Sequence, residues 1–140
     1  DAEITSISEL ESTMVGAVVG SPLSSPDLQV SGHVQYTAPL SGGNETFWRV
    51  DLSYIDSLTN GFPFTPGQAG VPSANFGYTD NVTKVDLSLG YVTDKWSAVL
   101  YAENAFDDDG YTFIMPQTFF DDRHMTLRPR TVGIRFTLNK

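Results

Sequence analysis

The span 130–139 near the C-terminus alternates between apolar and polar side chains, with Val132, Ile134, Phe136 and Leu138 on the even positions. A period of two places one kind of side chain on each face of a β-strand. The same alternation recurs over residues 28–36, 48–54 and 84–91, and less regularly over 96–103. The chain is therefore predicted to be all-β, an up-and-down antiparallel sheet or barrel of about five to six strands.

Helix is expected to contribute little, because no window combines a helical apolar stripe with a cap and a stop. The segment 8–13 is predicted to form one helical turn at most. Residues 1–8 are a candidate tail of a further strand, with Ile4 and Ile7 as its apolar positions.

The connections between these strands alternate strictly in length. Residues 41–45 and 93–95 are brief turns, whereas roughly 9–27, 56–81 and 106–125 are long and rich in Pro, Gly and aromatic residues. In an up-and-down sheet, all short turns then lie at one end and all long loops at the other. Outer-membrane barrels are built this way, and aromatic residues mark their interfaces. The strand-end aromatics that fit this role are Tyr36, Trp48, Tyr54, Tyr91 and Trp96.

Length and composition limit the classes of protein to which the chain can belong. A length of 140 residues fits a single β-domain, 1–140, and 40% hydrophobic residues are enough to bury a core. The net charge of −9 argues against binding to nucleic acid. The absence of cysteine excludes disulfides and thiolate metal sites. Because the chain does not begin with Met, we expect it to have been processed or cut from something longer.

Two segments, 100–108 and 128–136, carry a resemblance to a known family. The first contains Asn104, Phe106 and Asp107 in the order Asn-x-Phe-Asp, and the second contains Pro129-Arg130-Thr131. In this arrangement the chain resembles TonB-dependent outer-membrane receptors, whose penultimate strand runs into Asn-x-Phe-Asp and whose closing strand opens with Pro-Arg-Thr. The resemblance covers about residues 28–139, and Lys84 to Trp96 is similar to the strand and turn that precede these motifs.

The resemblance implies the C-terminal part of a 22-stranded barrel in the outer membrane of a Gram-negative bacterium. The parent receptor would take up a scarce nutrient, such as a ferric siderophore, cobalamin or a glycan. No plug domain or TonB box is recognisable in the 140 residues. The family's chains usually end on an aromatic residue, whereas this one ends on Lys140, with Phe136 the nearest aromatic. The implied partners are membrane lipid or another apolar sheet, the remainder of the barrel, and copies of the chain through sheet edges.

Two sets of loop residues are candidates for binding. Aromatic residues spaced among polar ones suit a bulky, partly apolar ligand, and an arginine suits its anionic groups. These ligand-binding candidates are Phe62, Phe64, Phe76, Tyr78, Tyr111, Phe113, Phe119, Phe120 and Arg123. Clustered carboxylates suit Ca²⁺, although their spacing matches no defined calcium loop. These metal candidates are Asp107, Asp108, Asp109, Asp121, Asp122 and His124, and their alternative role is a solvated loop surface.

Binding is favoured over catalysis, but two other classes stay open. One is a small soluble β-barrel enzyme, a metal-assisted hydrolase of esters or lactones that would use the acidic loop residues. The other is a lipocalin-type ligand-binding barrel, which would be soluble and would fill its interior with a ligand. A serine–histidine–aspartate triad has little support, because no Gly-x-Ser-x-Gly motif is present.

Overall fold

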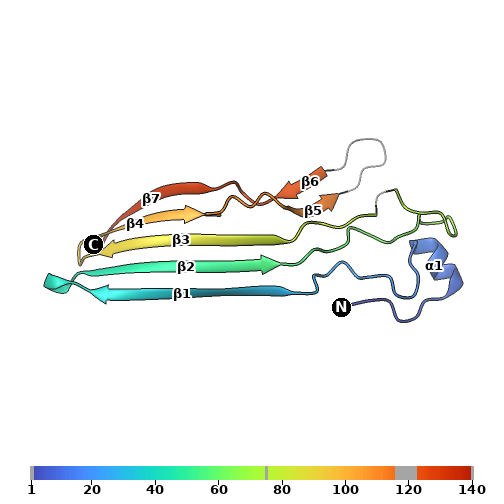
Figure 1. Ribbon diagram of the computed structural model, residues 1–140, viewed down its shortest axis with the longest axis horizontal. Helices are drawn as coiled ribbons and strands as arrows, with labels where there is room; N and C mark the ends of the chain where they lie inside the picture. The colour runs from blue at the N-terminus through green and yellow to red at the C-terminus, as the bar shows by residue number, and fades with distance from the viewer. Residues whose placement is uncertain (1, 75, 116–122, 140) are drawn as a thin grey trace. The chain divides into compact units, whose positions relative to one another are not determined.

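The structure, a computed structural model, describes residues 2–74, 76–115 and 123–139. Its main feature is a five-stranded antiparallel sheet with the strand order β1-β2-β3-β4-β7 (Figure 1). The five strands are β1 (Gln29–Pro39), β2 (Glu45–Ile55), β3 (Val82–Val92), β4 (Trp96–Glu103) and β7 (Thr131–Leu138). Two shorter strands, β5 (Tyr111–Met115) and β6 (Arg123–Thr126), pair with each other as a second sheet. The all-β prediction is confirmed.

The chain packs as two compact units. One, the connection unit, comprises residues 1–29, 55–82 and 110–126, and the other, the sheet unit, comprises 30–54, 83–109 and 127–140. The sheet unit holds nearly all of the five-stranded sheet, and the connection unit gathers the long connections that join its strands. The single β-domain over residues 1–140 stays a prediction.

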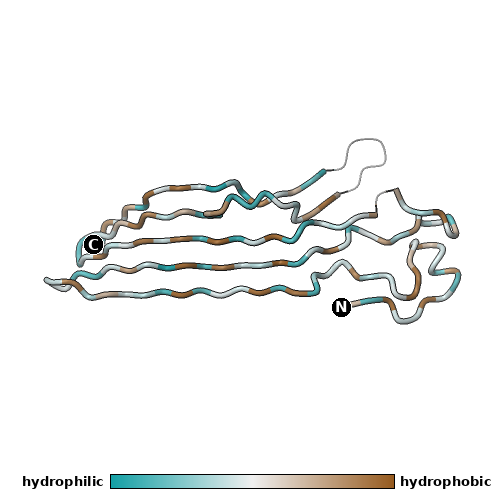
Figure 2. The backbone as a smooth tube through the Cα atoms, viewed as in Figure 1, coloured by the Kyte–Doolittle hydropathy of each residue, from teal (hydrophilic) through white to brown (hydrophobic). Residues whose placement is uncertain are grey.

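The register of the sheet unit explains the alternation in the sequence. Leu89 of β3 pairs with Leu100 of β4, which in turn pairs with Ile134 of β7. Because paired residues point to the same side of a sheet, the apolar positions of the three strands share one face. Figure 2 shows the resulting alternation of hydrophobic and hydrophilic residues along the strands. We call the two sides the apolar face and the polar face.

Very little apolar surface is buried. Among the described residues, Ala17, Val82 and Val85 are the only buried hydrophobic ones. The even positions of β7 illustrate the contrast, since Ile134 is 74% exposed and Leu138 is 73% exposed. Burial of apolar side chains is the main favourable term in folding in water, so a sheet with this face uncovered is incomplete as an aqueous fold.

Close approach of backbone to aromatic rings shapes the polar face. A Cβ added at Gly90 would collide with the ring of Phe47, and one added at Gly133 would lie 2.5 Å from the Tyr101 hydroxyl. Each ring therefore lies over a glycine of the neighbouring strand. Glycine weakens a strand because it has no side chain to pack. The aromatic ring of the neighbouring strand fills the space above it and replaces the missing contacts.

The helical content exceeds the prediction. Instead of a single turn over 8–13, the chain forms the seven-residue helix α1 (Glu9–Val15). Ser8 accepts a hydrogen bond from the Glu11 amide, and the Glu11 carboxylate accepts from the Ser8 amide, which is a complete capping box. Gly16 ends the helix with a left-handed φ of 76°. The helix was underestimated because its signal is in the caps rather than in an apolar stripe.

Two further expectations were wrong. The segment 1–8, of which residues 2–8 are described, forms no strand over those residues, and Glu3 makes only an isolated bridge to Pro22. The segment 106–125, expected to be a loop, contains β5 and the start of β6. Strands of four or five residues are too short for an alternating pattern to stand out from the aromatic and polar residues around them.

Candidate functional site

The apolar face ends in a row of aromatic side chains at the short-turn end of the sheet. One member comes from each of the five strands: Tyr36, Trp48, Tyr91, Trp96 and Phe136. The ring centroids of neighbours lie 5.9 Å apart for Tyr36 and Trp48, 5.5 Å for Tyr91 and Trp96, and 5.6 Å for Trp96 and Phe136. These contacts fix ring orientation within two groups, Tyr36 with Trp48 and Tyr91 with Trp96 and Phe136, and together the groups form an amphipathic border.

The polar face carries paired charges. The Arg49 guanidinium donates two hydrogen bonds to the Asp51 carboxylate, at 2.7 Å from Nε and 2.5 Å from Nη2. On the next strand, the Lys84 ammonium donates to Asp86 at 2.6 Å. Both pairs join residues two apart on one strand, which always lie on the same face. The polar face therefore presents neutralised ion pairs rather than a field of one sign.

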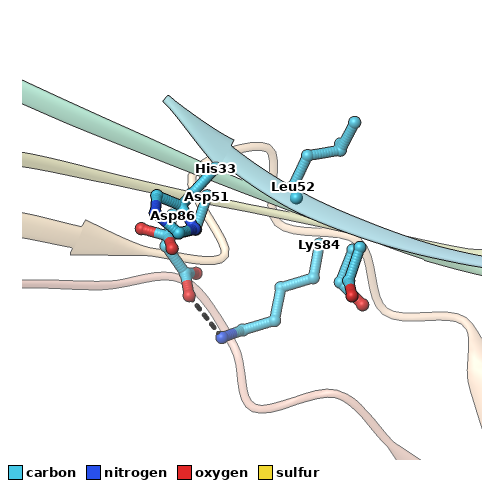
Figure 3. Close-up of a pocket in the computed structure, with 8 residues that line it drawn as sticks. His33, Asp51, Leu52, Lys84 and Asp86 are labelled. Carbon is cyan, nitrogen blue, oxygen red and sulfur yellow. Dashed lines mark hydrogen bonds and ion pairs between the residues drawn. The ribbon is translucent and has the colours of Figure 1, made fainter. Parts of the chain in front are cut away.

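A hollow of 370 Å³ opens between these pairs on strands β1, β2 and β3. In Figure 3, His33, Asp51 and Asp86 group together, Lys84 reaches Asp86, and Leu52 extends away from the group. The sequence did not indicate this hollow as a site, although the alternation places its polar residues on one face. The sheet brings together residues of β1, β2 and β3 that are far apart in the sequence.

This hollow has a polar wall with paired charges. Its carboxylates are already engaged in ion pairs with Arg49 and Lys84. The polar side chains of the hollow can bind ordered water or the polar groups of another surface.

The strongest polar cluster lies where β4 ends, at Asn104. This residue is 1% exposed and has a left-handed φ of 48°, a conformation in which Asn is favoured over other non-glycine residues. Its backbone amide donates to the Asp86 carboxylate at 2.8 Å. Its side-chain amide donates to the carbonyls of Asp108 at 2.9 Å and Arg128 at 3.0 Å. Its side-chain carbonyl accepts from the Asp108 amide at 3.1 Å.

Two carboxylates complete this cluster, which we call the Asn104 latch. Asp107, with a φ of 59°, accepts a hydrogen bond of 2.7 Å from the Arg130 amide. Asp108 accepts one of 2.8 Å from the Thr83 amide. The latch thus ties together the start of β3, the end of β4 and the start of β7. It also joins the Asn-x-Phe-Asp and Pro-Arg-Thr segments, since the Arg130 amide of the second donates to Asp107 of the first.

The predicted metal ligands find no common site in the described structure. Asp107 and Asp108 serve the latch, and His124 stacks on Tyr111 with ring centroids 4.3 Å apart. Asp121 and Asp122 lie outside the described residues. No group of three or more histidine and carboxylate side chains suited to a metal occurs in the portion of the chain that is described. The calcium site, including Asp109, stays a prediction.

The predicted ligand-binding aromatics divide by exposure. Phe62, Phe64 and Phe76 are half-buried, whereas Tyr78 is 60% exposed. The amide of Phe64 donates to the Gly16 carbonyl at 3.0 Å, so this segment is fixed against the end of α1.

The second group of predicted aromatics belongs to the short hairpin. Tyr111 and Phe113 of β5 are 41% and 42% exposed, and Arg123 of β6 is exposed. Phe119 and Phe120 lie outside the described residues. The structure therefore places the described candidates in the connection unit but does not gather them into one cluster.

No helix in the described part of the chain is long and apolar enough to cross a membrane. No family model, curated protein or solved structure matches the chain.

Proposed function

We propose that this chain is the C-terminal part of the β-barrel of a TonB-dependent outer-membrane receptor, which binds and takes up a scarce nutrient. The observation that carries the proposal is the largely exposed apolar face of the sheet unit, with its aromatic border. Lipid is the solvent that makes such a face favourable, because a β-barrel in a membrane turns an apolar band outward.

Three further features support the same function. The opposite face carries ion pairs and a polar hollow, as the inner wall of a large barrel does. The aromatic row lies at the end with the short turns, where one membrane interface would be. β1 and β7 are the outer strands in the sheet order, so each offers an edge to the rest of the barrel or to another copy.

The length of the apolar band also suits a membrane. β1, β2 and β3 each have 11 residues, which is about 36 Å at roughly 3.3 Å per residue. Outer-membrane barrels present an apolar band about 25 Å tall to the lipid, and a tilted strand of about 9–11 residues crosses it. The three longest strands are thus of the size that this function requires.

Substitution at two adjacent positions of β3 tests the proposal. Leu89 lies on the apolar face and is 54% exposed, whereas Ser88 lies on the polar face at the same height. With the chain folded into phospholipid vesicles, Leu89→Lys should lower the free energy of unfolding by about 2–4 kcal/mol, because it places a charge in lipid. Ser88→Lys should change it by less than about 1 kcal/mol.

Urea titrations of both variants and the parent chain measure these differences. In water an exposed leucine tolerates lysine, so a sheet that faces water would give two small and similar effects. Equal stability of the two variants in vesicles would therefore contradict the proposed lipid-facing role.

A further inference from the structure

A groove of 350 Å³ lies wholly within the connection unit. Polar side chains supply most of the groups that matter for recognition: Glu3, Ser25, Asp27, Ser57, Thr59 and Tyr78. The volume is at the lower end of the range for small-molecule sites, which is about 300–1,000 Å³. The groove is thus large enough for a small ligand or for one end of a longer one.

Both sides of the groove are held by backbone hydrogen bonds. On one side, the Leu23 amide donates to the Ala2 carbonyl at 2.8 Å. On the other, the Thr79 amide donates to the Leu58 carbonyl at 2.9 Å, and the Thr79 hydroxyl accepts from the Leu58 amide at 3.0 Å. Because both sides are fixed in this way, a ligand would meet a site that needs little ordering.

Thr59 gives the groove an unused hydrogen-bonding group. The residue is 3% exposed, and among the described residues its Oγ1 is the only buried side-chain nitrogen or oxygen without a hydrogen-bond partner. Leaving a buried hydroxyl unpaired costs about 1–3 kcal/mol, so most such groups in folded proteins have a partner. An unpaired hydroxyl at a groove is therefore a reason to expect a hydrogen-bonding ligand there.

Tyr78 gives the groove a flat aromatic surface. Its ring is 60% exposed, and the edge-on ring of Phe76 holds it at a centroid distance of 5.6 Å. An exposed tyrosine combines a large apolar ring with a hydroxyl that donates and accepts hydrogen bonds. Such a surface suits the face of a sugar ring, where apolar C–H groups alternate with hydroxyls at the rim.

Charge decides between classes of ligand. The connection unit contains nine acidic residues and one basic residue, Arg123, which gives it a net charge of −8. The groove is lined by the carboxylates of Glu3 and Asp27 and by no Lys or Arg. Carboxylates only accept hydrogen bonds, so they suit hydroxyl donors and repel anions.

From this combination we infer that the groove binds a neutral, hydroxyl-rich ligand of the saccharide class. The inference rests on the proposed function, because it names the class of nutrient that the long connections of the receptor would recognise. It disfavours anionic metal chelates as ligands of this site. Tyr78 supplies the stacking surface, the two carboxylates accept hydroxyl hydrogens, and Thr59 supplies one further hydrogen bond.

Isothermal titration calorimetry on the full chain in phospholipid vesicles tests the inference. The probes are neutral hexose oligosaccharides and uronic-acid oligosaccharides of the same lengths. The neutral series should bind and the acidic series should not. Tyr78→Ala should weaken binding by about tenfold, equivalent to the loss of one stacking contact, whereas Tyr78→Phe should stay within about threefold of the parent.

Thr59→Val separates binding from folding. Since the hydroxyl has no partner in the unliganded protein, its replacement by a methyl group should leave the midpoint of urea unfolding unchanged or raised. The same substitution should weaken saccharide binding by about fivefold, because the ligand then loses a hydrogen bond.

Three results would overturn the inference: no neutral oligosaccharide binds, the acidic series binds as well, or Tyr78→Ala binds like the parent. Leu89→Lys and Ser88→Lys, measured in the same vesicles, report on the proposed function independently. A preparation in which Leu89→Lys is destabilised but no neutral saccharide binds would contradict the groove and leave the receptor assignment standing.

Discussion

The sheet unit and the connection unit differ in how their charged residues are distributed. The sheet unit carries seven basic and eight acidic residues, whereas the connection unit carries one basic and nine acidic residues. Nearly all of the net charge of −9 thus belongs to the long connections. In the sheet, charges are paired across two positions of one strand, and the remaining face is apolar.

The two units also differ in what fixes their structure. A periodic pattern of side chains sets the register of the sheet, so its structure depends on many positions together. The connection unit depends on particular local features, such as the capping box of α1 and the close approach of Gly16 to Phe64. We therefore expect sheet variants to affect cooperative unfolding and connection variants to act locally.

Removal of the Asn104 side chain should have the largest effect. Asn104→Ala removes three hydrogen bonds at a buried position and also disfavours the left-handed backbone. The free energy of unfolding should fall by about 3 kcal/mol or more, measured by urea titration in vesicles. Asn104→Gly, which accepts the backbone angle, should recover only the smaller, conformational part of the loss.

If Asn104→Ala unfolds at the same urea concentration as the parent, the latch is not what joins β3, β4 and β7. A selective loss of structure in the connection unit would also contradict the comparison, because the latch belongs to the sheet unit.

Disruption of the contact between Phe47 and Gly90 should have an intermediate effect on stability. Gly90→Ala places a methyl group where the Phe47 ring lies, and the clash should destabilise the sheet by about 1–3 kcal/mol. In a Phe47→Ala background the same substitution should be nearly neutral, since the ring is gone. A double-mutant cycle that gives purely additive losses would show that the ring does not rest on this glycine.

Acidification should weaken α1 by the smallest amount. Hydrogen bonds from the hydroxyl and the amide of Ser8 hold the pKa of Glu11 below its ordinary value of 4.5. A carboxyl group with a lowered pKa contributes its stabilisation above 4.5, and this contribution is lost as the pH falls through the lowered value.

Amide hydrogen exchange of residues 9–15 as a function of pH measures this effect. Protection of α1 should decline below pH 4.5 in the parent and should show no such step in Glu11→Gln. The same step in both proteins would mean that a different carboxyl group controls the helix.

The sheet could be predicted from the sequence because the apolar–polar alternation is a local pattern that each strand repeats. Alternation over 28–36, 48–54, 84–91 and 96–103 lies within strands β1 to β4, apart from a one-residue difference at the start of β1. Ser8 and Glu11 already formed the sequence signature of a capping box, so α1 could have been recognised from its start. The β5–β6 hairpin could not, because its strands are too short to show a period.

Prediction of the site was more limited, for a physical reason. Tyr78 was selected because exposed loop aromatics suit ligands, and it lies in the groove. The role of Thr59 depends on the absence of a hydrogen-bond partner, which no sequence pattern shows. The Asn-x-Phe-Asp motif marked Asn104 but not its bonds to Arg128, which is 24 residues away, and to Asp86, which is 18 residues away. The negative charge of the long connections, by contrast, can be read directly from their composition.

Fluorescence of the two tryptophans tests the central claim, that the apolar face of the sheet meets lipid, most directly. Trp48 and Trp96, the only tryptophans of the chain, both belong to the aromatic row at one end of that face. With the chain folded into vesicles, lipids brominated at a series of acyl positions report the depth of each tryptophan in single-tryptophan variants. We predict that both are quenched most strongly by bromines near the headgroups, at matching depths, and that both are protected from acrylamide. Acrylamide quenching of both tryptophans without any quenching by brominated lipid would contradict the account.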